Sequence, residues 1–127
     1  MPPFTPSKHT VRASAVLTTS YVAGTVFSMD RQNYLGILVD FTKGSLTSLE
    51  VKIESSIDGG ANYGQQATEA TSGGTITTSL GERTFTATGK YWIIVNPLLA
   101  DTIKISVKGT GTVTSSLCAV SAVTGTV

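Results

Sequence analysis

The chain has 127 residues, which is enough for one domain with a sizeable core but too few for a second. Charged residues make up only 13% of it and the formal net charge is +1, so no basic stripe is available to neutralise phosphates and nucleic acid is a poor candidate partner. No apolar run reaches membrane-spanning length, and the first ten residues lack the apolar stretch of a signal peptide. We therefore expect no membrane partner, and synthesis in a reducing cytoplasm.

Residues 1–9 are predicted to form an extended N-terminal arm, and residues 10–127 the folded domain. Three of the four prolines, Pro2, Pro3 and Pro6, lie in this arm, and proline removes the backbone donors that a sheet needs. Phe4, between them, has two interpretations. The arm is either a disordered terminus, or a segment that docks Phe4 on a neighbouring subunit.

From residue 10 onward the chain has the pattern of successive short strands. Residues 49–54 give the clearest case, because Leu, Val and Ile alternate with Glu and Lys. Residues 103–108 repeat that alternation, and residues 35–41 show it more weakly. Residues 91–95 are apolar at every position, which predicts a central strand covered on both faces, whereas residues 67–75 are predicted to be a polar loop. Eight or so strands predict an all-β, antiparallel β-sandwich, jelly-roll-like in topology.

The residues that carry most enzyme chemistry are scarce. His9 and Cys118 are the only histidine and cysteine, too few for a zinc site of nitrogen and sulfur ligands. His9 is expected to be solvated at the arm boundary, and Cys118 to be a small buried thiol. Asp58 precedes two glycines, a pattern that turn chemistry explains better than a calcium loop. We expect no catalytic residue, no cofactor, no metal and no enzyme activity.

Aromatic side chains raise one alternative, a sugar-stacking platform. Only Tyr63, in the turn-rich segment after Asp58, is expected to be exposed at a loop tip. The other aromatic residues in question are expected in strand cores or cross-strand pairs; they are Tyr21, Tyr34, Tyr91 and Trp92.

Three segments together resemble the capsid decoration, or cement, proteins of tailed bacteriophages. They are an alternating strand that ends in Ser-Ser-Ile-Asp-Gly-Gly-Ala-Asn-Tyr (residues 49–63), Lys-Tyr-Trp-Ile-Ile-Val-Asn-Pro (90–97), and a strand that ends in Gly-Thr-Gly (101–114). The resemblance spans residues 34–123, and its motifs are those of β-hairpins in general. It implies a β-sandwich on the outside of a phage head, commonly trimeric, with an N-terminal arm that clamps a capsid subunit or a neighbouring copy.

Three functions of different classes follow. The first is a head decoration protein that binds the major capsid protein, or another virion protein, at the capsid surface and stabilises the shell. The second is a tail, neck or baseplate component, and the third is a carbohydrate-binding module for host attachment. Because residues 109–127 carry no charge, we expect a closed homo-oligomer, with a trimer favoured. The candidate contact residues are the arm residues Pro2, Pro3, Phe4 and Pro6, and the loop residues Tyr63, Leu98 and Leu99.

Overall fold

The computed structural model describes residues 6–65, 67–80, 82–95 and 100–126, with the backbone alone for residues 67–71 and 76–80. Within these ranges every regular element is a β-strand and every strand pair is antiparallel, so the predicted fold class is confirmed. The same ranges contain no helix that is long and apolar enough to cross a membrane.

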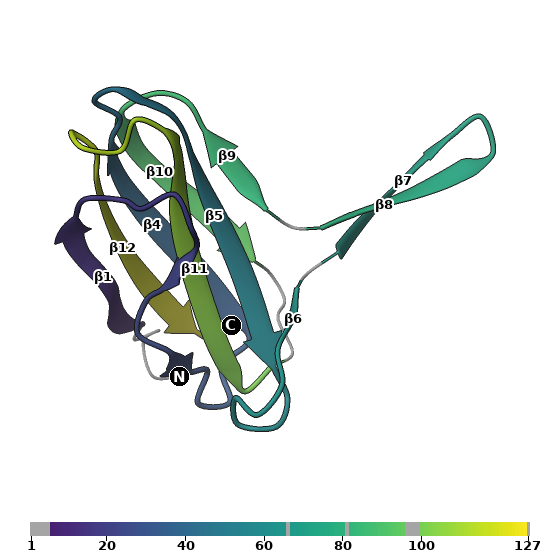
Figure 1. The fold of residues 1–127 in the computed structure, drawn as a ribbon. Helices are drawn as coiled ribbons and strands as arrows, with labels where there is room; N and C mark the ends of the chain where they lie inside the picture. The colour runs from purple at the N-terminus through teal and green to yellow at the C-terminus, as the bar shows by residue number, and fades with distance from the viewer. Residues whose placement is uncertain (1–5, 66, 81, 96–99, 127) are drawn as a thin grey trace.

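Two sheets pack face to face and form the sandwich (Figure 1). The four-stranded sheet has the order β1 (Ser7–Ala15), β12 (Leu117–Gly125), β4 (Tyr34–Thr42) and β10 (Gly89–Val95). The second sheet is built on β11 (Thr102–Gly111) and β5 (Leu46–Ser56). Short strands flank this pair, namely β2 (Val22–Ala23) and β3 (Phe27–Ser28) beside β11, and β6 (Gly64–Gln65) and β9 (Arg83–Phe85) beside β5.

The strand pairing is that of a jelly roll. The first strand pairs with the last, β2 and β3 pair with the last but one, β4 pairs with β10, and β5 pairs with β6 and β9. Such nested pairing describes one long hairpin that is wrapped so that its strands fall into two sheets. The jelly-roll topology predicted from the strand pattern is therefore present.

The core lies between the sheets and comes from alternate positions of the long strands. Leu49, Val51 and Ile53 on β5 are buried, whereas the charged residues between them face outward, as the alternation predicts. Each large apolar side chain removed from water in this way stabilises the fold by about 1.5–3 kcal/mol before the loss of conformational entropy is subtracted. The largest side chains buried to within 2% exposure include Phe41, Leu17, Met29, Leu35, Ile37 and Ile105.

The first strand begins earlier than the predicted arm boundary. Ser7, Lys8 and His9 pair with Thr124, Val123 and Ala122 on β12, so residues 7–9 belong to the sheet. His9 is also not solvated as expected. Its ring stacks on Phe27 with centroids 4.6 Å apart, and its Nε2 lies 3.2 Å from the buried hydroxyl of Thr124.

Strand β10 corrects a second expectation, since it is an edge strand and not a central one. Among the described residues it pairs with β4 alone. Ile93 and Val95 face the core, but Trp92 and Ile94 on the other face are 58% and 60% exposed. The apolar run therefore reflects one face buried in the core and one apolar face that no described residue covers.

The segment predicted as a polar loop contains most of a β-hairpin, made of β7 (Ala67–Ser72) and β8 (Thr75–Leu80). Its two-residue turn is Gly73-Gly74, with φ angles of 58° and 79°. Two successive positive φ angles are what a tight hairpin turn of the I′ type requires, and glycine adopts them without strain. The hairpin leaves the sandwich between β6 and β9 and extends away from it (Figure 1).

Candidate interaction surfaces

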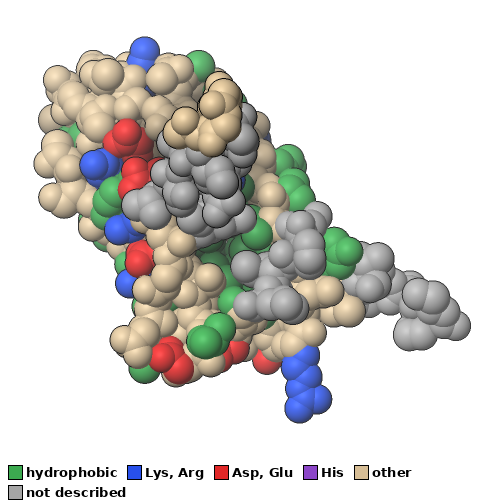
Figure 2. Space-filling view, turned by 90° about the vertical axis from the view of Figure 1, so that its right-hand side faces the viewer, with side chains coloured by type: hydrophobic (Ala, Val, Ile, Leu, Met, Phe, Trp, Pro, Cys, Tyr) green, Lys and Arg blue, Asp and Glu red, His purple; other side chains and the backbone are tan. Residues whose placement is uncertain are grey.

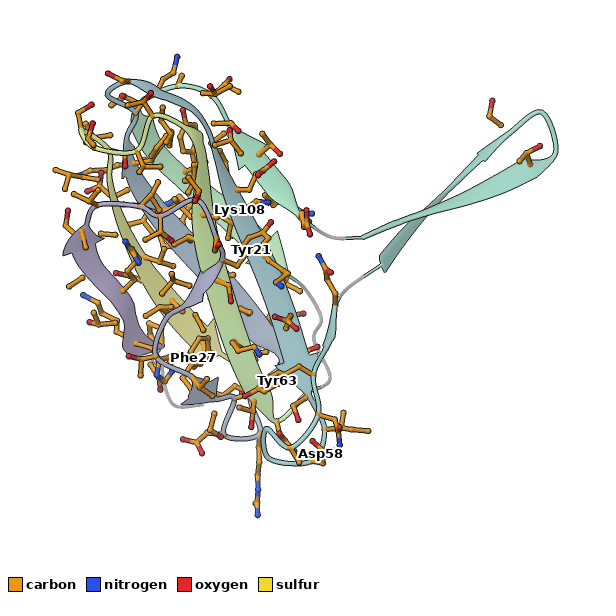
Figure 3. The ribbon with its side chains drawn as sticks, in the orientation of Figure 1. Tyr21, Phe27, Asp58, Tyr63 and Lys108 are labelled. Carbon is orange, nitrogen blue, oxygen red and sulfur yellow. The ribbon has the colours of Figure 1, made fainter. Side chains whose placement is uncertain are left out.

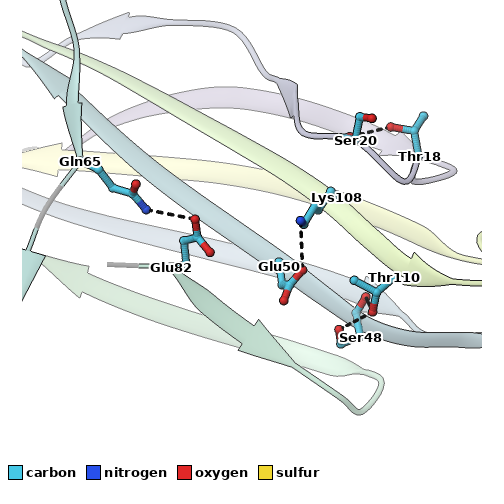
Figure 4. Close-up of polar contacts among 8 residues, drawn as sticks. All are labelled: Thr18, Ser20, Ser48, Glu50, Gln65, Glu82, Lys108 and Thr110. Carbon is cyan, nitrogen blue, oxygen red and sulfur yellow. Dashed lines mark hydrogen bonds and ion pairs between the residues drawn. The ribbon is translucent and has the colours of Figure 1, made fainter. Parts of the chain in front are cut away.

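The outer face of the second sheet is covered by ionic and aromatic side chains of the chain itself. On it, Glu54 lies 3.8 Å from the ammonium group of Lys104 and 3.7 Å from that of Lys52, and Glu50 lies 3.7 Å from that of Lys108. Lys104 faces Glu54 and Lys108 faces Glu50 across β5 and β11, as cross-strand pairing dictates, whereas Lys52 lies two residues from Glu54 on β5 itself. Figure 4 shows the Lys108–Glu50 pair, together with the Ser48–Thr110 hydrogen bond of 2.6 Å on the same two strands.

Two tyrosines cover this row of charges (Figure 3). The ring centroid of Tyr21 lies 4.5 Å from the ammonium of Lys52 and 4.8 Å from that of Lys108, and the centroid of Tyr63 lies 4.2 Å from that of Lys104. Such cation–π contacts are favourable because the ring face carries partial negative charge. Tyr63 is thus half-buried beneath the ammonium group of Lys104 and is not exposed at a loop tip as predicted. Lys52, Lys104 and Lys108 already have partners, so these three lysines do not form a free basic patch for an anionic ligand.

The Tyr21 hydroxyl is buried and makes no hydrogen bond of full geometry with a described residue, although it lies near enough to the Glu82 carboxylate for a weak one. Burial raises the pKa of Tyr21 to about 12, and the negative charges of Glu82 and Glu50, with the weak hydrogen bond to Glu82, add to the effect, because each disfavours the phenolate. Glu82 also accepts a hydrogen bond from the side chain of Gln65 at 3.4 Å (Figure 4). This bond joins the segment that leads into the β7–β8 hairpin to the segment that leaves it.

The Asp58 loop is a closed turn and not an open ligand site. Its carboxylate accepts hydrogen bonds from the Ser56 hydroxyl at 2.6 Å and from the backbone and side-chain nitrogens of Asn62, both at 2.9 Å. The bond from Ser56, with those from Asn62, lowers the pKa of Asp58 to about 2, since each stabilises the charged form. Among the described residues, no three histidine, cysteine, aspartate or glutamate side chains lie close enough together to hold a metal ion.

The outer face of the four-stranded sheet is different, because it presents apolar side chains. Trp92 and Ile94 on β10 lie directly opposite Leu38 and Gly36 on β4. A methyl group placed on Gly36 would meet the Trp92 ring at 3.4 Å and Ile94 at 3.7 Å, so both side chains lie over the glycine. Beyond β4, half-buried Ala119, Ser121 and Val123 of β12 continue the face. At one end of this face, Lys90 on β10 lies opposite Asp40 on β4, and these two residues carry its charges.

The two faces of the sandwich therefore differ in chemical character. Figure 2 shows one side of the molecule, with one group of charged side chains along the left of the view, others at its lower end, and hydrophobic side chains mainly at the centre and right. Isolated apolar residues on a surface are common, but a contiguous apolar strip is typical of a contact with another molecule. We call Trp92, Ile94 and Leu38 the apolar strip.

Sequence reasoning found only part of these surfaces. Of the predicted contact residues, Pro6 is exposed and Tyr63 is half-buried, while Pro2, Pro3, Phe4, Leu98 and Leu99 lie outside the described residues. The apolar strip does not follow from the sequence, in which Trp92 fits a strand core or a cross-strand pair. The sequence predicts a polar loop over residues 67–75, although Gly73-Gly74, between two runs compatible with strands, is a hairpin signal.

Comparison with known proteins adds a fold relationship. No protein-family model and no curated protein sequence matches the chain. Among solved structures, the chain is similar to the SPBc2 prophage-derived protein YomS, with a TM-score of 0.62, 16% sequence identity, and 99% of this chain and 97% of that chain covered. At this identity the similarity establishes a shared fold. A chain in the structure of infectious bursal disease virus, Gx strain, is also similar over 96% of this chain and 33% of that chain, at 16% identity. Its TM-score of 0.41 is too low to carry an argument.

Proposed function

We propose that this protein is a structural component of a bacteriophage particle, and specifically a head decoration protein that binds the outside of the capsid and stabilises it. The observation that carries the proposal is the similarity in fold to a prophage-derived protein along nearly the whole length of both chains. The motif resemblance to decoration proteins supports the same class. A tail, neck or baseplate component remains the alternative, because phage particles use β-sandwiches in those positions too.

The surfaces support a protein that acts through contacts and not through chemistry. The described residues offer an apolar strip, an open sheet edge and a projecting hairpin, while the charged side chains of the opposite face pair with one another. Each of the first three features is suited to a protein partner. The partner in the proposed function is the major capsid protein or another virion protein, and the proposed assembly is a homotrimer.

The N-terminal segment is the second proposed point of attachment. Because β1 begins at Ser7, removal of residues 2–6 leaves every described pairing of β1 intact. If Phe4 is buried on a capsid subunit, its deletion removes about 1.5–3 kcal/mol of apolar contact per copy. Truncated and full-length proteins are to be compared for binding to undecorated heads, with melting curves as the control for folding. Equal binding would restrict attachment to the sandwich itself.

The direct test of the class is fractionation of the particles. Heads and tails separated on a gradient are probed for a tagged copy of the chain, and heads with and without it are heated. A decoration protein is expected in the head fraction, and its absence is expected to lower the temperature at which the heads release DNA. Recovery in the tail fraction would favour the alternative, and recovery in neither would reject the proposal.

Carbohydrate binding is the second candidate, and exposed Trp92 is the observation that favours it, since sugars stack on exposed aromatic rings. The neighbours of this ring argue against it. Gly36, Leu38 and Ile94 supply no hydrogen-bonding side chains, so Lys90 and Asp40 at one end of the face and Ser121 on β12 are left to bind the hydroxyls that a sugar needs to pair when they leave water. Glycan-array binding that is lost in Trp92→Ala would support this candidate over the structural one.

A further inference from the structure

Strand β10 is a sheet edge that lacks the usual protection against pairing. It runs in unbroken register with β4 from Gly89 to Val95, and it carries one charge, at Lys90, and no proline. Exposed edges are normally blocked by bulges, charges or proline. The opposite edge of the same sheet, β1, has two register shifts and is rich in basic residues. Only one of the two edges is therefore built to accept another strand.

The apolar strip lies beside this open edge. A strand that paired with β10 would place alternate side chains on the outer face of the sheet, next to Trp92 and Ile94. The edge would supply main-chain hydrogen bonds and the strip would supply apolar contact, which is the combination used when a strand is added to a sheet. Large aromatic residues such as Trp92 commonly dominate the energy of such contacts.

The hairpin β7–β8 has the complementary properties. Its strands hydrogen-bond only to each other among the described residues, and its tip, residues 72–75, is exposed. An isolated two-stranded hairpin is marginally stable in water, so it gains stability from a partner. Its strands have six residues and β10 has seven, which corresponds to about 20 and 23 Å. Residues 67–80 contain one charge, at Glu69, so little desolvation of charge opposes its docking.

We infer that the hairpin β7–β8 of one copy pairs with the open edge β10 of a second copy and covers its apolar strip, so that the four-stranded sheet continues into the neighbouring molecule. The hairpin points away from its own sandwich (Figure 1), which makes the partner a different molecule. Each chain carries one hairpin and one edge, so the contact is head-to-tail, and it forms the proposed closed ring when the rotation that relates successive copies returns to the first copy. This contact goes beyond the proposed function, since it does not depend on the role of the protein in a particle.

Three variants test this contact. The hairpin variant lacks residues 67–80 and joins residues 66 and 81. The strip variant carries Trp92→Lys and Ile94→Lys. The control variant carries Val26→Lys and Ile57→Lys, two exposed apolar residues outside the strip, and so has the same added charge. Masses are measured by sedimentation over a range of concentrations, with circular dichroism melts to establish that each variant is folded.

The wild type and the control are expected to form the same closed oligomer. The hairpin and strip variants are each expected to associate at least about tenfold more weakly, because each lacks one half of the contact. An equimolar mixture of the two is expected to form a one-to-one dimer, since one keeps the edge and the other keeps the hairpin. A monomeric wild type would overturn the inference. A hairpin variant that associates as strongly as the wild type would also overturn it, and would indicate that two β10 edges pair with each other. A mixture of the hairpin and strip variants that stays monomeric would overturn it as well.

Discussion

The ring of Trp92 on β10 lies against the backbone of Gly36 on β4, so close that a methyl group on Gly36 would sit 3.4 Å from the ring. That distance is ordinary van der Waals contact, and Gly36 does not have a positive φ. The Trp92 ring thus lies over a glycine whose position has room for a methyl group and whose backbone conformation other residues can adopt.

Replacement of Gly36 by alanine is expected to stabilise the protein by about 0.5–1 kcal/mol, because alanine has less backbone entropy to lose on folding. Gly24→Ala is the matched comparison. A methyl group there would lie 2.5 Å from both the side chain and the carbonyl oxygen of Val11, so a loss of stability of about 1–3 kcal/mol is expected. Urea denaturation measures both. Destabilisation by Gly36→Ala as large as that by Gly24→Ala would show that the sheet at Trp92 is packed more tightly than described.

Tyr21→Phe is expected to change stability by no more than about 1 kcal/mol, because the buried hydroxyl makes no hydrogen bond of full geometry with a described residue and at most a weak one with Glu82. The substitution also removes a pH effect. The pKa of Tyr21 is raised from 10.0 to about 12, so the folded state keeps the proton that the unfolded state releases, and the wild type loses stability as the pH rises above 10. Melting curves from pH 8 to pH 11 compare the two proteins. If the stability of Tyr21→Phe fell more steeply with rising pH than that of the wild type, the raised pKa of Tyr21 would be contradicted.

Asp58 is expected to make the protein sensitive to acid. Its pKa is lowered from 3.8 to about 2, so the stability that it contributes is present above its unfolded pKa and is lost as the pH falls from 3.8 toward 2. Asp58→Asn lacks that titration and is expected to show a flatter profile in this window. Thermal melts at successive pH values provide the measurement, with Asp30→Asn as a control at another exposed carboxylate. Parallel profiles for the wild type and Asp58→Asn would mean that the turn is not held by the ionised carboxylate.

Cys118 is expected to be inert in the folded protein. The thiol is fully buried, and burial raises its pKa to about 11, so little of the reactive thiolate exists at neutral pH. Ellman's reagent should react with it only after denaturation. Cys118→Ser is expected to cost about 1–3 kcal/mol, because a hydroxyl is then buried where the thiol packed among apolar side chains. Rapid reaction of the native protein would show that β12 opens readily from the sheet.

The sequence predicts the sandwich well where burial alternates. Residues 49–54 have a charge at every second position, and residues 103–108 have Lys, Ser and Lys there; the structure places the charged residues on the outer face and the apolar residues inside, while Ser106 is buried. The reason is physical, since a half-buried strand needs the period of two that its pleat imposes. The jelly-roll order follows from the number of such strands and their turns.

The interaction surfaces were not predictable in the same way. The apolar run at residues 91–95 fits a strand covered on both faces as well as an edge strand with an apolar outer face, because periodicity reports which faces are apolar and not what covers them. Residues 67–75 have a Thr, Ser and Gly composition shared by loops and exposed ribbons. The pairing of strands in the folded protein decides between a central and an edge strand, and between a loop and a hairpin. That pairing depends on residues that are distant in the sequence.

Electron cryomicroscopy of purified particles tests the central claim, that this chain is a structural part of a phage particle and acts through its exposed strands. The account predicts density for the jelly roll on the outside of the head, with the β10 edge and the Trp92 strip covered by a hairpin from an adjacent copy. Particles that contain no copy of the chain would contradict the proposed function. Copies that sit on the head with β10 and Trp92 open to solvent would contradict the inferred contact while leaving the function intact.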